Sequence, residues 1–260
     1  MIAKSDLIEG MVKGMAVLES FDTERQRLNA TLTSQRTGVT RAAARRHLLT
    51  LAHLGYLDSD GSYFWLSSKV LRFSGSYLAS ARLPRVVQPT LERLAAHTRE
   101  SFSAVLLNGD EVVIVARSSH VRNGAGDGVP QVLAYGLHLG ARLPVHATST
   151  GRVLLAGLPK SAFNDWMKNR VLRRMTMHTV TENRQFRGVI EQARRDDFCL
   201  SSEEHELGVH ALAVPLRNLQ GQTVAALNVV ASPARLSPVV MQRELLPLLL
   251  EAARELRPLL

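Results

Sequence analysis

The sequence lacks the features that mark secreted, zinc-bound or membrane proteins. Cys199 is the single cysteine among 260 residues, which excludes a disulfide framework and a cysteine-ligated zinc site within one chain. No window of about 18 apolar residues is present, and the start of the chain, Met1 to Asp6, has no apolar signal-peptide core. We therefore expect a cytoplasmic protein without a membrane segment.

The motifs of the common enzyme classes are also missing. The chain has no Gly-x-Ser-x-Gly elbow, no phosphate-binding loop and no dinucleotide fingerprint, and Ser149 has no base at a recognisable spacing. His146 and His210 lie far apart in sequence, without the spacing of a helical metal site, so we expect them to be hydrogen-bonding residues of a core or pocket. We predict no catalytic residues, no cofactor and no metal, and keep a small-molecule-binding enzyme as the distant alternative.

Acidic residues are absent from one long window. Residues 25–57 contain six arginines and no aspartate or glutamate, whereas the rest of this chain, whose net charge is +9, mixes the two signs. The centre of the window predicts a helix over residues 41–54, because Thr40 can cap its start and Gly55 can adopt the left-handed conformation that ends it. A rigid basic helix is typical of a protein that contacts DNA.

Helical periodicity divides this predicted helix into two faces. The apolar face, which we expect to pack, consists of Ala44, His47, Leu48, Leu51 and Leu54. The basic face, which we expect to be free, consists of Arg41, Ala42, Arg45, Arg46, Leu49, Thr50 and His53. Two alternatives stay open: a solvated helix face with no partner, and a nonspecific nucleic-acid-binding or scaffold protein.

The flanking residues complete a winged helix-turn-helix. Residues 28–36 predict a shorter helix and residues 37–39 a tight turn before the reading helix, while residues 56–66 predict two short strands around an Asp-Gly turn, the wing. The expected DNA contacts are Arg36, Thr40, Arg41, Ala42, Arg45, Arg46, Thr50, Ser62 and Tyr63. An arginine that reads guanine is the expected specific contact.

The remainder of the chain predicts an α+β fold with an antiparallel sheet flanked by helices. Residues 67–81 predict a connecting helix, which Leu83-Pro84 ends before a second amphipathic helix over residues 85–98. Strands are expected at residues 103–107, 111–116, 199–202, 212–216 and 223–230, and helices at 152–158, 186–196 and 238–256. The glycines of residues 124–128 predict a loop inside this domain, which is suited to enclosing a small molecule.

The chain resembles the IclR-type bacterial transcriptional regulators over nearly its whole length. The segments that carry the resemblance are residues 45–51 with 54–56, 67–71, 146–156, 201–208 and 211–215. The resemblance implies a winged helix-turn-helix DNA-binding domain at residues 1–66, a linker helix at 67–82 and a GAF-like effector-binding domain at 83–260. It also implies a homodimer or a dimer of dimers that binds a palindromic operator in double-stranded DNA.

A narrower similarity points to the subgroup that governs the β-ketoadipate pathway. It rests on residues 76–81 with 83–84, 100–103 and 140–144, and it implies a response to aromatic acids or their ring-cleavage products, such as 4-hydroxybenzoate, protocatechuate or β-ketoadipate. His210-Ala211 stands where this subgroup more often has Arg-Ser, and Asp197 replaces a usual glycine. A regulator of this family that senses another small carboxylate or keto acid is the alternative.

The predicted effector site needs a receiver for a carboxylate and hydroxyl partners. The hydroxyls and N–H groups at the start of the helix after residue 148 favour an anion, and Arg142 could form a bidentate clamp or pair with an acid on the surface. A second polar group beside the strand at residues 212–216 could hydrogen-bond a ring hydroxyl. The expected effector-binding residues are Arg142, His146, Thr148, Ser149, Thr150, Ser201, Glu203, Glu204 and His210.

Overall fold

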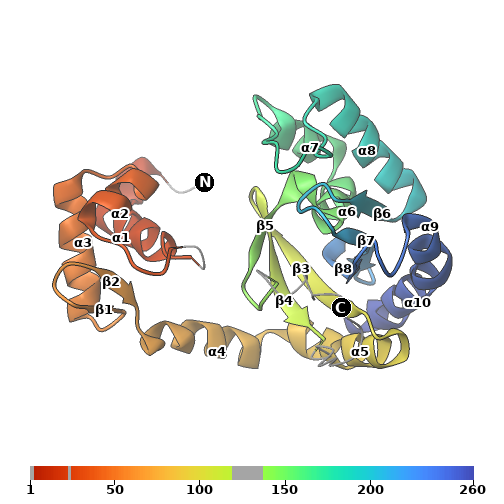
Figure 1. Cartoon of the computed structure of the whole chain (residues 1–260), viewed down its shortest axis with the longest axis horizontal. Helices are drawn as coiled ribbons and strands as arrows, with labels where there is room; N and C mark the ends of the chain where they lie inside the picture. The colour runs from red at the N-terminus through yellow and green to blue at the C-terminus, as the bar shows by residue number, and fades with distance from the viewer. Residues whose placement is uncertain (1–2, 23–24, 119–136) are drawn as a thin grey trace. The chain divides into compact units, whose positions relative to one another are not determined.

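The computed structural model describes residues 3–22, 25–118 and 137–260, and it divides into two compact units, Met1–Ala79 and Ser80–Leu260 (Figure 1). Residues 124–128, for which the sequence predicts a glycine-rich loop, lie outside the described residues. Every helix in the described part of the chain is too short or too polar to cross a membrane.

The first unit is a winged helix-turn-helix. Its elements are α1 (Glu9–Glu19), α2 (Ala30–Thr37), α3 (Arg41–His53) and the antiparallel strands β1 (Leu57–Ser59) and β2 (Phe64–Leu66). The three helices and the hairpin enclose a core that includes Val17, Leu28, Leu48, Leu57 and Phe64. Burial of these apolar side chains fixes the reading helix against the rest of the unit. The predicted motif is confirmed (Figure 1).

Helix α2 is held by its caps and by tertiary contacts, because its residues have poor helix propensity. The side chain of Asn29 accepts hydrogen bonds from the N–H groups of Thr31 and Leu32, and Gly38 ends the helix with φ +73°. The helix begins two residues later than predicted, because Leu28 pairs instead with Phe64 of the wing through backbone hydrogen bonds of 3.0 and 2.8 Å. Leu28 thereby ties the wing to the helix pair.

The connecting segment contains the short 3-10 turn Ser68–Val70, then α4 (Leu71–Ser80) and α5 (Arg82–Thr98). The predicted start of the second helix at residue 85 is wrong, since Leu83 and Pro84 lie inside the first turn of α5. A proline is accommodated there because the first N–H groups of a helix have no intrahelical acceptor.

The second unit is built on an antiparallel sheet. Its six strands among the described residues follow the order β5 (Arg142–Pro144), β4 (Glu111–Arg117), β3 (Ser101–Asn108), β8 (Thr223–Ala231), β7 (His210–Arg217) and β6 (Cys199–Ser202). Gly109, at φ +61°, closes the predicted hairpin between β3 and β4. The centre of the sheet pairs β3 with β8, two strands that lie far apart in sequence. The predicted α+β class is confirmed.

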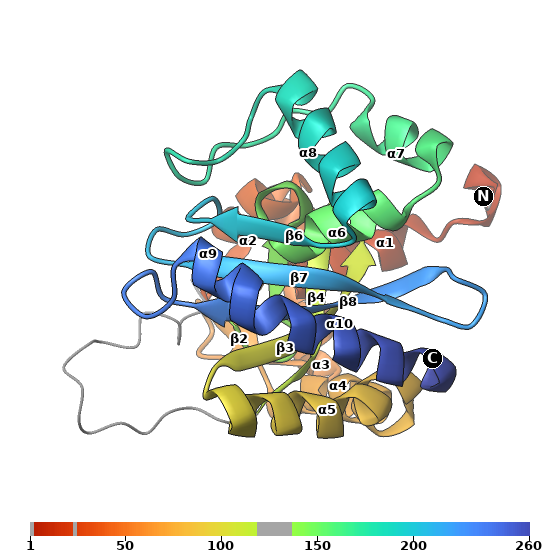
Figure 2. The same ribbon diagram turned by 90° about the vertical axis from the view of Figure 1, so that its right-hand side faces the viewer.

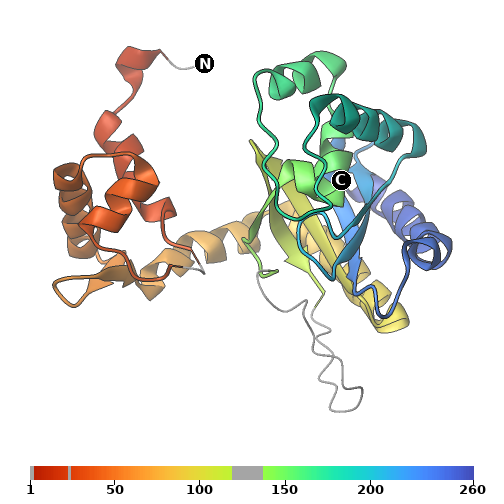
Figure 3. The ribbon, with the colours of Figure 1, turned by 45° about the horizontal axis from the view of Figure 1, so that its top comes forward.

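Helices cover both faces of this sheet. On one face, α5 and α10 (Leu246–Leu256) pack side by side over a core that includes Val87, Leu91 and Leu249 (Figure 2). On the other face, α6 (Ser149–Gly157) lies against the strands, and α8 (Asn183–Asp196) packs on α6 (Figure 3). A second core forms there, with α7 (Lys160–Met167) contributing Phe163. The start of α6 therefore lies on the face of the sheet that carries this second core.

The predicted closing helix over residues 238–256 is interrupted. It consists of α9 (Pro238–Val240), a π-helical segment at Met241–Leu245 and α10. The N–H of Leu246 bonds the carbonyl of Met241, five residues earlier, and the following Pro247 has no N–H with which to continue the α-helical pattern. The helix thus widens over Met241–Leu245, just before Pro247, and continues in the same core.

Candidate functional site

The basic face of α3 is open to solvent. The side chains of Arg41, Arg45 and Arg46 are exposed and have no hydrogen bond or ion pair with any other described residue, whereas Ala44 and Leu48 of the opposite face are fully buried. Thr40 caps the helix by accepting from the N–H of Ala43 at 3.3 Å, as predicted. Three cations on one rigid face are thus free to contact an external anion.

Two details of this helix differ from the prediction. Leu54, expected on the packed face, is 48% exposed, because the helix ends at His53 and the chain turns away at Gly55, φ +78°. Arg36 is exposed but forms an ion pair with Asp22. Its charge is therefore already partly neutralised, unlike the charges of the α3 arginines.

The other predicted DNA contacts lie at the surface of the same unit. Ala42, Thr50, Ser62 and Tyr63 are exposed, and the hydroxyl of Thr50 donates to the carbonyl of Arg46 at 2.8 Å.

The wing has a turn braced by an acid. The N–H groups of Ser62 and Tyr63 donate to the carboxylate of Asp60 at 3.0 and 2.8 Å, which lowers the pKa of that carboxyl, the bond from Tyr63 having the larger effect. Arg27, which the sequence analysis did not select, pairs with Asp60 and lies 4.6 Å from the ring centre of Trp65. Arg27 therefore supports the wing.

A cavity lies on the α6 side of the sheet in the second unit. Its volume is about 60 Å³, several times the roughly 10–15 Å³ that one water molecule needs. Strands β3 to β8, the start of α6 and the loop after β6 all contribute to its wall. The lining residues are Ser103, Val105, Ile114, Leu137, Leu143, Ala147, Thr148, Ser149, Thr150, Ser201, Glu204, His205, Glu206, Val209, Ala211, Asn228 and Val230.

Several polar atoms of this wall have no partner. Ser149 Oγ, His205 Nδ1 and Asn228 Oδ1 are buried without a hydrogen bond in the described part of the chain. Buried polar groups in folded proteins are almost always satisfied, so an unpaired group requires an explanation. Here all three residues line the same cavity. Such an arrangement can receive a polar molecule.

The start of α6 is fixed by a cap and by a glycine. Thr148 accepts from the N–H of Gly151 at 3.2 Å and donates to the carbonyl of Pro144 at 3.1 Å. A Cβ atom at Gly151 would lie 2.1 Å from the carbonyl oxygen of Val145, so only glycine permits this close backbone approach. The first N–H groups of α6, which lack intrahelical acceptors, are thereby held at the cavity.

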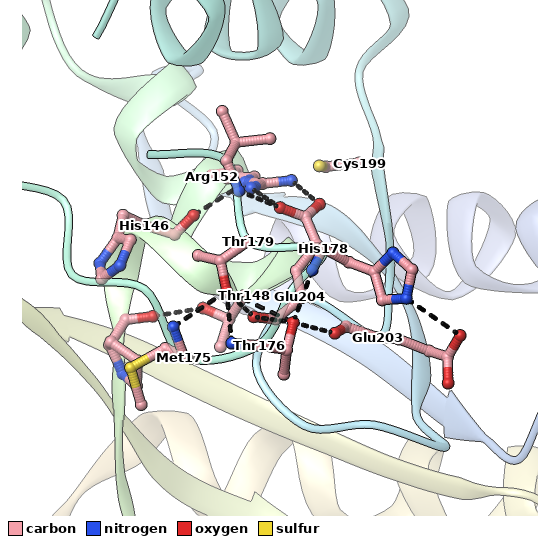
Figure 4. A network of polar contacts seen from close by, with 12 residues as sticks. His146, Thr148, Arg152, Met175, Thr176, His178, Thr179, Cys199, Glu203 and Glu204 are labelled. Atoms are coloured by element: carbon pink, nitrogen blue, oxygen red, sulfur yellow. Dashed lines mark hydrogen bonds and ion pairs between the residues drawn. The ribbon is translucent and has the colours of Figure 1, made fainter. Parts of the chain in front are cut away.

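Behind the cavity wall lies a network of polar contacts (Figure 4). The guanidinium of Arg152 forms two parallel 2.5 Å bonds to the carboxylate of Glu204, and Arg152 Nε donates to the carbonyl of His146 at 2.9 Å. Arg152 is 2% exposed. The hydroxyls of Thr176 and Thr179 donate at 2.6 Å to the carbonyls of Glu203 and Glu204. The loop after β6 is thus anchored to α6 and to residues 176–179.

The structure brings together five of the nine predicted effector-binding residues. Thr148, Ser149, Thr150, Ser201 and Glu204 line the cavity. Arg142 does not line it: this residue is 45% exposed and lies 3.5 Å from Glu111 on the neighbouring strand, the surface pair weighed as its alternative role. The predicted clamp therefore finds no support in the geometry.

The other three predicted residues also lie outside the cavity lining. Burial lowers the pKa of His146, and its Nε2 donates to the carbonyl of Arg173 at 2.8 Å. Glu203 accepts from the N–H of Gly208 at 2.8 Å and so closes the loop after β6. His210 is buried at the start of β7, and burial lowers its pKa. His146 and Glu203 thus hold backbone groups of the surrounding loops.

Ser103, His205 and Asn228 are lining residues that the sequence analysis missed. Asn228 had a detectable signal, since it is the one polar residue in the otherwise apolar run 224–231, of which residues 225–231 are buried. A buried polar residue in a central strand is unusual and marks a functional candidate. Ser103 is its direct partner across β3 and β8. His205 had no comparable signal, since it stands in a polar loop.

The described residues contain no group of three or more histidine, cysteine, aspartate or glutamate side chains arranged to hold a metal ion. The polar groups that line the cavity are hydroxyl, amide, imidazole and carboxylate groups.

Family models match both units of the chain. The IclR helix-turn-helix domain matches residues 11–61, and the model described as bacterial transcriptional regulator IclR, C-terminal, matches residues 75–257. The chain belongs to the IclR family. The predicted identity is thereby confirmed, and this IclR-family protein is a transcriptional regulator.

Two relatives place the regulator more closely. It is 49% identical over 259 residues to the Pca operon regulatory protein of Acinetobacter baylyi, covering 100% of this chain and 91% of the relative. It is also 49% identical over 263 residues to the p-hydroxybenzoate hydroxylase transcriptional activator of the same species, covering 99% and 94%. The regulator therefore falls in the branch that controls aromatic catabolism, as the sequence predicted.

A solved structure resembles the second unit. The inducer-binding domain of a double mutant of the PobR transcription factor from Acinetobacter, crystallised with 3-hydroxybenzoic acid, is 45% identical, with a TM-score of 0.61. The match covers 68% of this chain and 98% of the PobR domain. The unit that contains the cavity thus has the fold of an inducer-binding domain.

Proposed function

We propose that the cavity of this IclR-family regulator binds a small aromatic carboxylate of the hydroxybenzoate class, and that binding changes the affinity of the winged helix for operator DNA. The observation that carries the proposal is the set of unpaired buried atoms, Ser149 Oγ, His205 Nδ1 and Asn228 Oδ1, in a single cavity at the start of α6. The relative crystallised with 3-hydroxybenzoic acid supports the ligand class.

The polar groups of the cavity suit the two ends of such a ligand. The start of α6, with the N–H groups and hydroxyls of Ser149 and Thr150, receives the carboxylate, because a helix N-terminus favours an anion. Val105, Ile114 and Leu143 offer an apolar wall for the ring. Asn228 and His205 are then available to a ring hydroxyl. Ser201 and Glu204 add further polar groups to the lining.

On the DNA side, the α3 face is the reading surface. Arg41, Arg45 and Arg46 supply the base and phosphate contacts, supported by Thr40, Ala42 and Thr50, because an exposed basic helix of a helix-turn-helix enters the major groove. Ser62 and Tyr63 of the wing touch the DNA backbone. Arg36 contributes only after its ion pair with Asp22 opens.

The regulator works in the cytoplasm as a homodimer or dimer of dimers on a palindromic operator, and it is not an enzyme. Exposed apolar side chains in the first unit, among them Met11 at 66% and Leu71 at 65%, agree with such an assembly. The linker at residues 67–82 transmits the state of the effector domain, since a ligand shifts an equilibrium only by binding its two states differently. Sedimentation of the full chain over a range of concentrations tests the assembly, and a monomer throughout would contradict it.

Calorimetric titration of the full chain tests the ligand. The panel is 4-hydroxybenzoate, 3-hydroxybenzoate, protocatechuate and β-ketoadipate. At least one should bind, and Ser149→Ala should weaken it by about tenfold to a hundredfold, the value of a lost hydrogen bond to a charged group. Ser161→Ala, at an exposed serine of α7, is the matched control and should leave binding unchanged. No binding by any member of the panel, or equal affinity for Ser149→Ala and wild type, would contradict the proposal.

A further inference from the structure

The cavity wall contains two carboxylates, although we propose an anionic ligand for it. Glu204 and Glu206 both line the cavity. An ionised carboxylate in a partly desolvated wall repels another anion, and this repulsion is much stronger than in bulk water because the local dielectric constant is lower. The charge of the wall therefore decides which ligands the cavity accepts.

Arg152 treats the two carboxylates differently. It holds Glu204 through both carboxylate oxygens at 2.5 Å, while Glu206 has no hydrogen bond or ion pair in the described part of the chain. The N–H of Val180 also donates to Glu204 Oε2 at 3.1 Å. The charge of Glu204 is thus already satisfied by Arg152 and by the N–H of Val180.

The guanidinium itself stays behind the wall. Arg152 is 2% exposed and does not line the cavity; in Figure 4 it lies beside Cys199, between the carboxylate of Glu204 and the carbonyl of His146. Burial raises the pKa of the Cys199 thiol to about 11, so this neighbour is neutral at physiological pH. Glu204 is therefore the anion that balances the buried charge of Arg152.

We propose that Arg152 is a specificity-determining residue that acts through Glu204: by neutralising this one carboxylate of the wall, it makes the cavity select carboxylate ligands over neutral ones without touching the ligand. The inference rests on the proposed function. The alternative is that the Arg152–Glu204 pair has only a structural role, as a brace that holds the loop after β6 in place. Such a brace would affect an anionic and a neutral ligand of the same shape equally.

The test compares an anionic ligand with a neutral one of nearly the same shape, 4-hydroxybenzoate and 4-hydroxybenzamide. Calorimetry gives the dissociation constants of both for the full chain, and the readout is their ratio. In Arg152→Met, the uncompensated charge of Glu204 should lower the preference for the carboxylate by at least about tenfold. In Glu204→Gln, the uncompensated charge of Arg152 should raise that preference by a similar factor. In Arg152→Met/Glu204→Gln, the ratio should return to within about threefold of wild type.

The carboxylate preference should fall in Arg152→Met and rise in Glu204→Gln, and these opposite changes separate a role in selectivity from a structural role. A brace alone predicts that both variants lose both ligands in equal proportion. If Arg152→Met does not fold, the rise in Glu204→Gln and the recovery in the double variant still decide the question. An unchanged ratio in Glu204→Gln, or a fall in both single variants, would overturn the inference.

Glu206→Gln is the comparison variant, because it removes a lining carboxylate that has no counter-ion among the described residues. It should strengthen binding of the carboxylate ligand. The double variant leaves the net charge of the wall unchanged, so it should not strengthen that binding. If wild type binds no carboxylate of the panel given above, the proposed function falls and the inference falls with it; if it binds another aromatic member of the panel better than 4-hydroxybenzoate, that carboxylate and its amide take the place of the two test compounds. If wild type binds the carboxylate and the ratio is insensitive to Arg152 and Glu204, the inference alone is wrong.

Discussion

The arginines of α3 and the arginine of α6 use the same side chain in opposite ways. Arg41, Arg45 and Arg46 are exposed and lack partners among the described residues, whereas Arg152 is buried and held by Glu204 and His146. An exposed cation on a rigid helix keeps its charge for an external anion. A buried one must be neutralised within the protein, and its effect reaches a ligand only through its partner.

The largest effect on stability should come from breaking the buried pair. Arg152→Met leaves the carboxylate of Glu204 without its counter-ion, and removal of one member of a buried pair typically lowers the free energy of unfolding by about 3–5 kcal/mol. Urea unfolding followed by the fluorescence of Trp166, in a Trp65→Phe background, measures it. Arg152→Met/Glu204→Gln should recover most of the loss because no unpaired charge remains. A loss below about 1 kcal/mol in the single variant would show that the pair is solvated.

The next effect concerns the free arginines. Arg41→Ala and Arg45→Ala should each weaken operator binding by about 1–3 kcal/mol where the side chain reads a base, or lower the salt dependence by about one charge where it neutralises a phosphate. Stability should change by less than about 0.5 kcal/mol, since neither side chain has a partner among the residues that the structure describes. Fluorescence anisotropy with operator DNA at several salt concentrations distinguishes the two roles. Arg254→Ala, at an exposed position of α10, is the control, and unchanged operator affinity in both α3 variants would remove the assignment.

The same contrast explains how much the sequence could predict. Helix α3 is a local feature: its start, cap and basic face follow from Thr40 and the thirteen residues after it and were predicted correctly, with Leu54 as the exception at the end of the helix. The wing is likewise contained in residues 57–66. Local periodicity is sufficient for such a site because helix geometry alone decides which side chains share a face.

The cavity depends on pairings that periodicity does not reveal. Ser103 and Asn228 face each other across β3 and β8. More than half of the second unit separates these strands along the chain, so no local pattern places the two residues together. Ser149 and Thr150 were predicted from the family resemblance and from the chemistry of a helix start, and Glu204 from its place in a polar group beside the strand at residues 212–216. Arg142 was predicted on chemistry alone, which suits an anion but does not state on which side of the sheet the side chain lies.

Protonation of buried histidines provides a smaller effect, confined to the second unit. Burial lowers the pKa values of His146, His205 and His210, so below the ordinary histidine pKa of about 6.5 the unfolded chain binds protons that the folded chain does not. The folded state holds these histidines in their neutral form. Their contribution to the free energy of unfolding is therefore fully present above about pH 6.5 and decreases as the pH falls below it. Each contributes at most about 1.4 kcal/mol per pH unit.

Urea unfolding at pH 7.5, 6.5 and 5.5 checks this dependence. The midpoint for the second unit should fall with pH, and His146→Gln should flatten the decline because one proton fewer is taken up on unfolding. His97→Gln, an exposed histidine of α5, should leave the slope unchanged. A midpoint that rises on acidification would contradict the assignment of neutral, buried imidazoles.

The smallest effect should come from Arg142, and it sharpens the contrast between a paired surface arginine and a paired buried one. Arg142 and Glu111 are 45% and 42% exposed and 3.5 Å apart, and exposed ion pairs contribute only about 0–1 kcal/mol. Arg142→Ala should therefore change the free energy of unfolding by no more than this, and it should leave the dissociation constant of 4-hydroxybenzoate within about twofold, because water screens a charge that does not line the cavity. Calorimetric dissociation constants of 4-hydroxybenzoate for Arg142→Ala and Arg152→Met, measured side by side, compare the surface pair with the buried one. A tenfold loss of affinity in Arg142→Ala would restore the clamp predicted from the sequence, and it would require β5 to turn this side chain inward when the ligand binds.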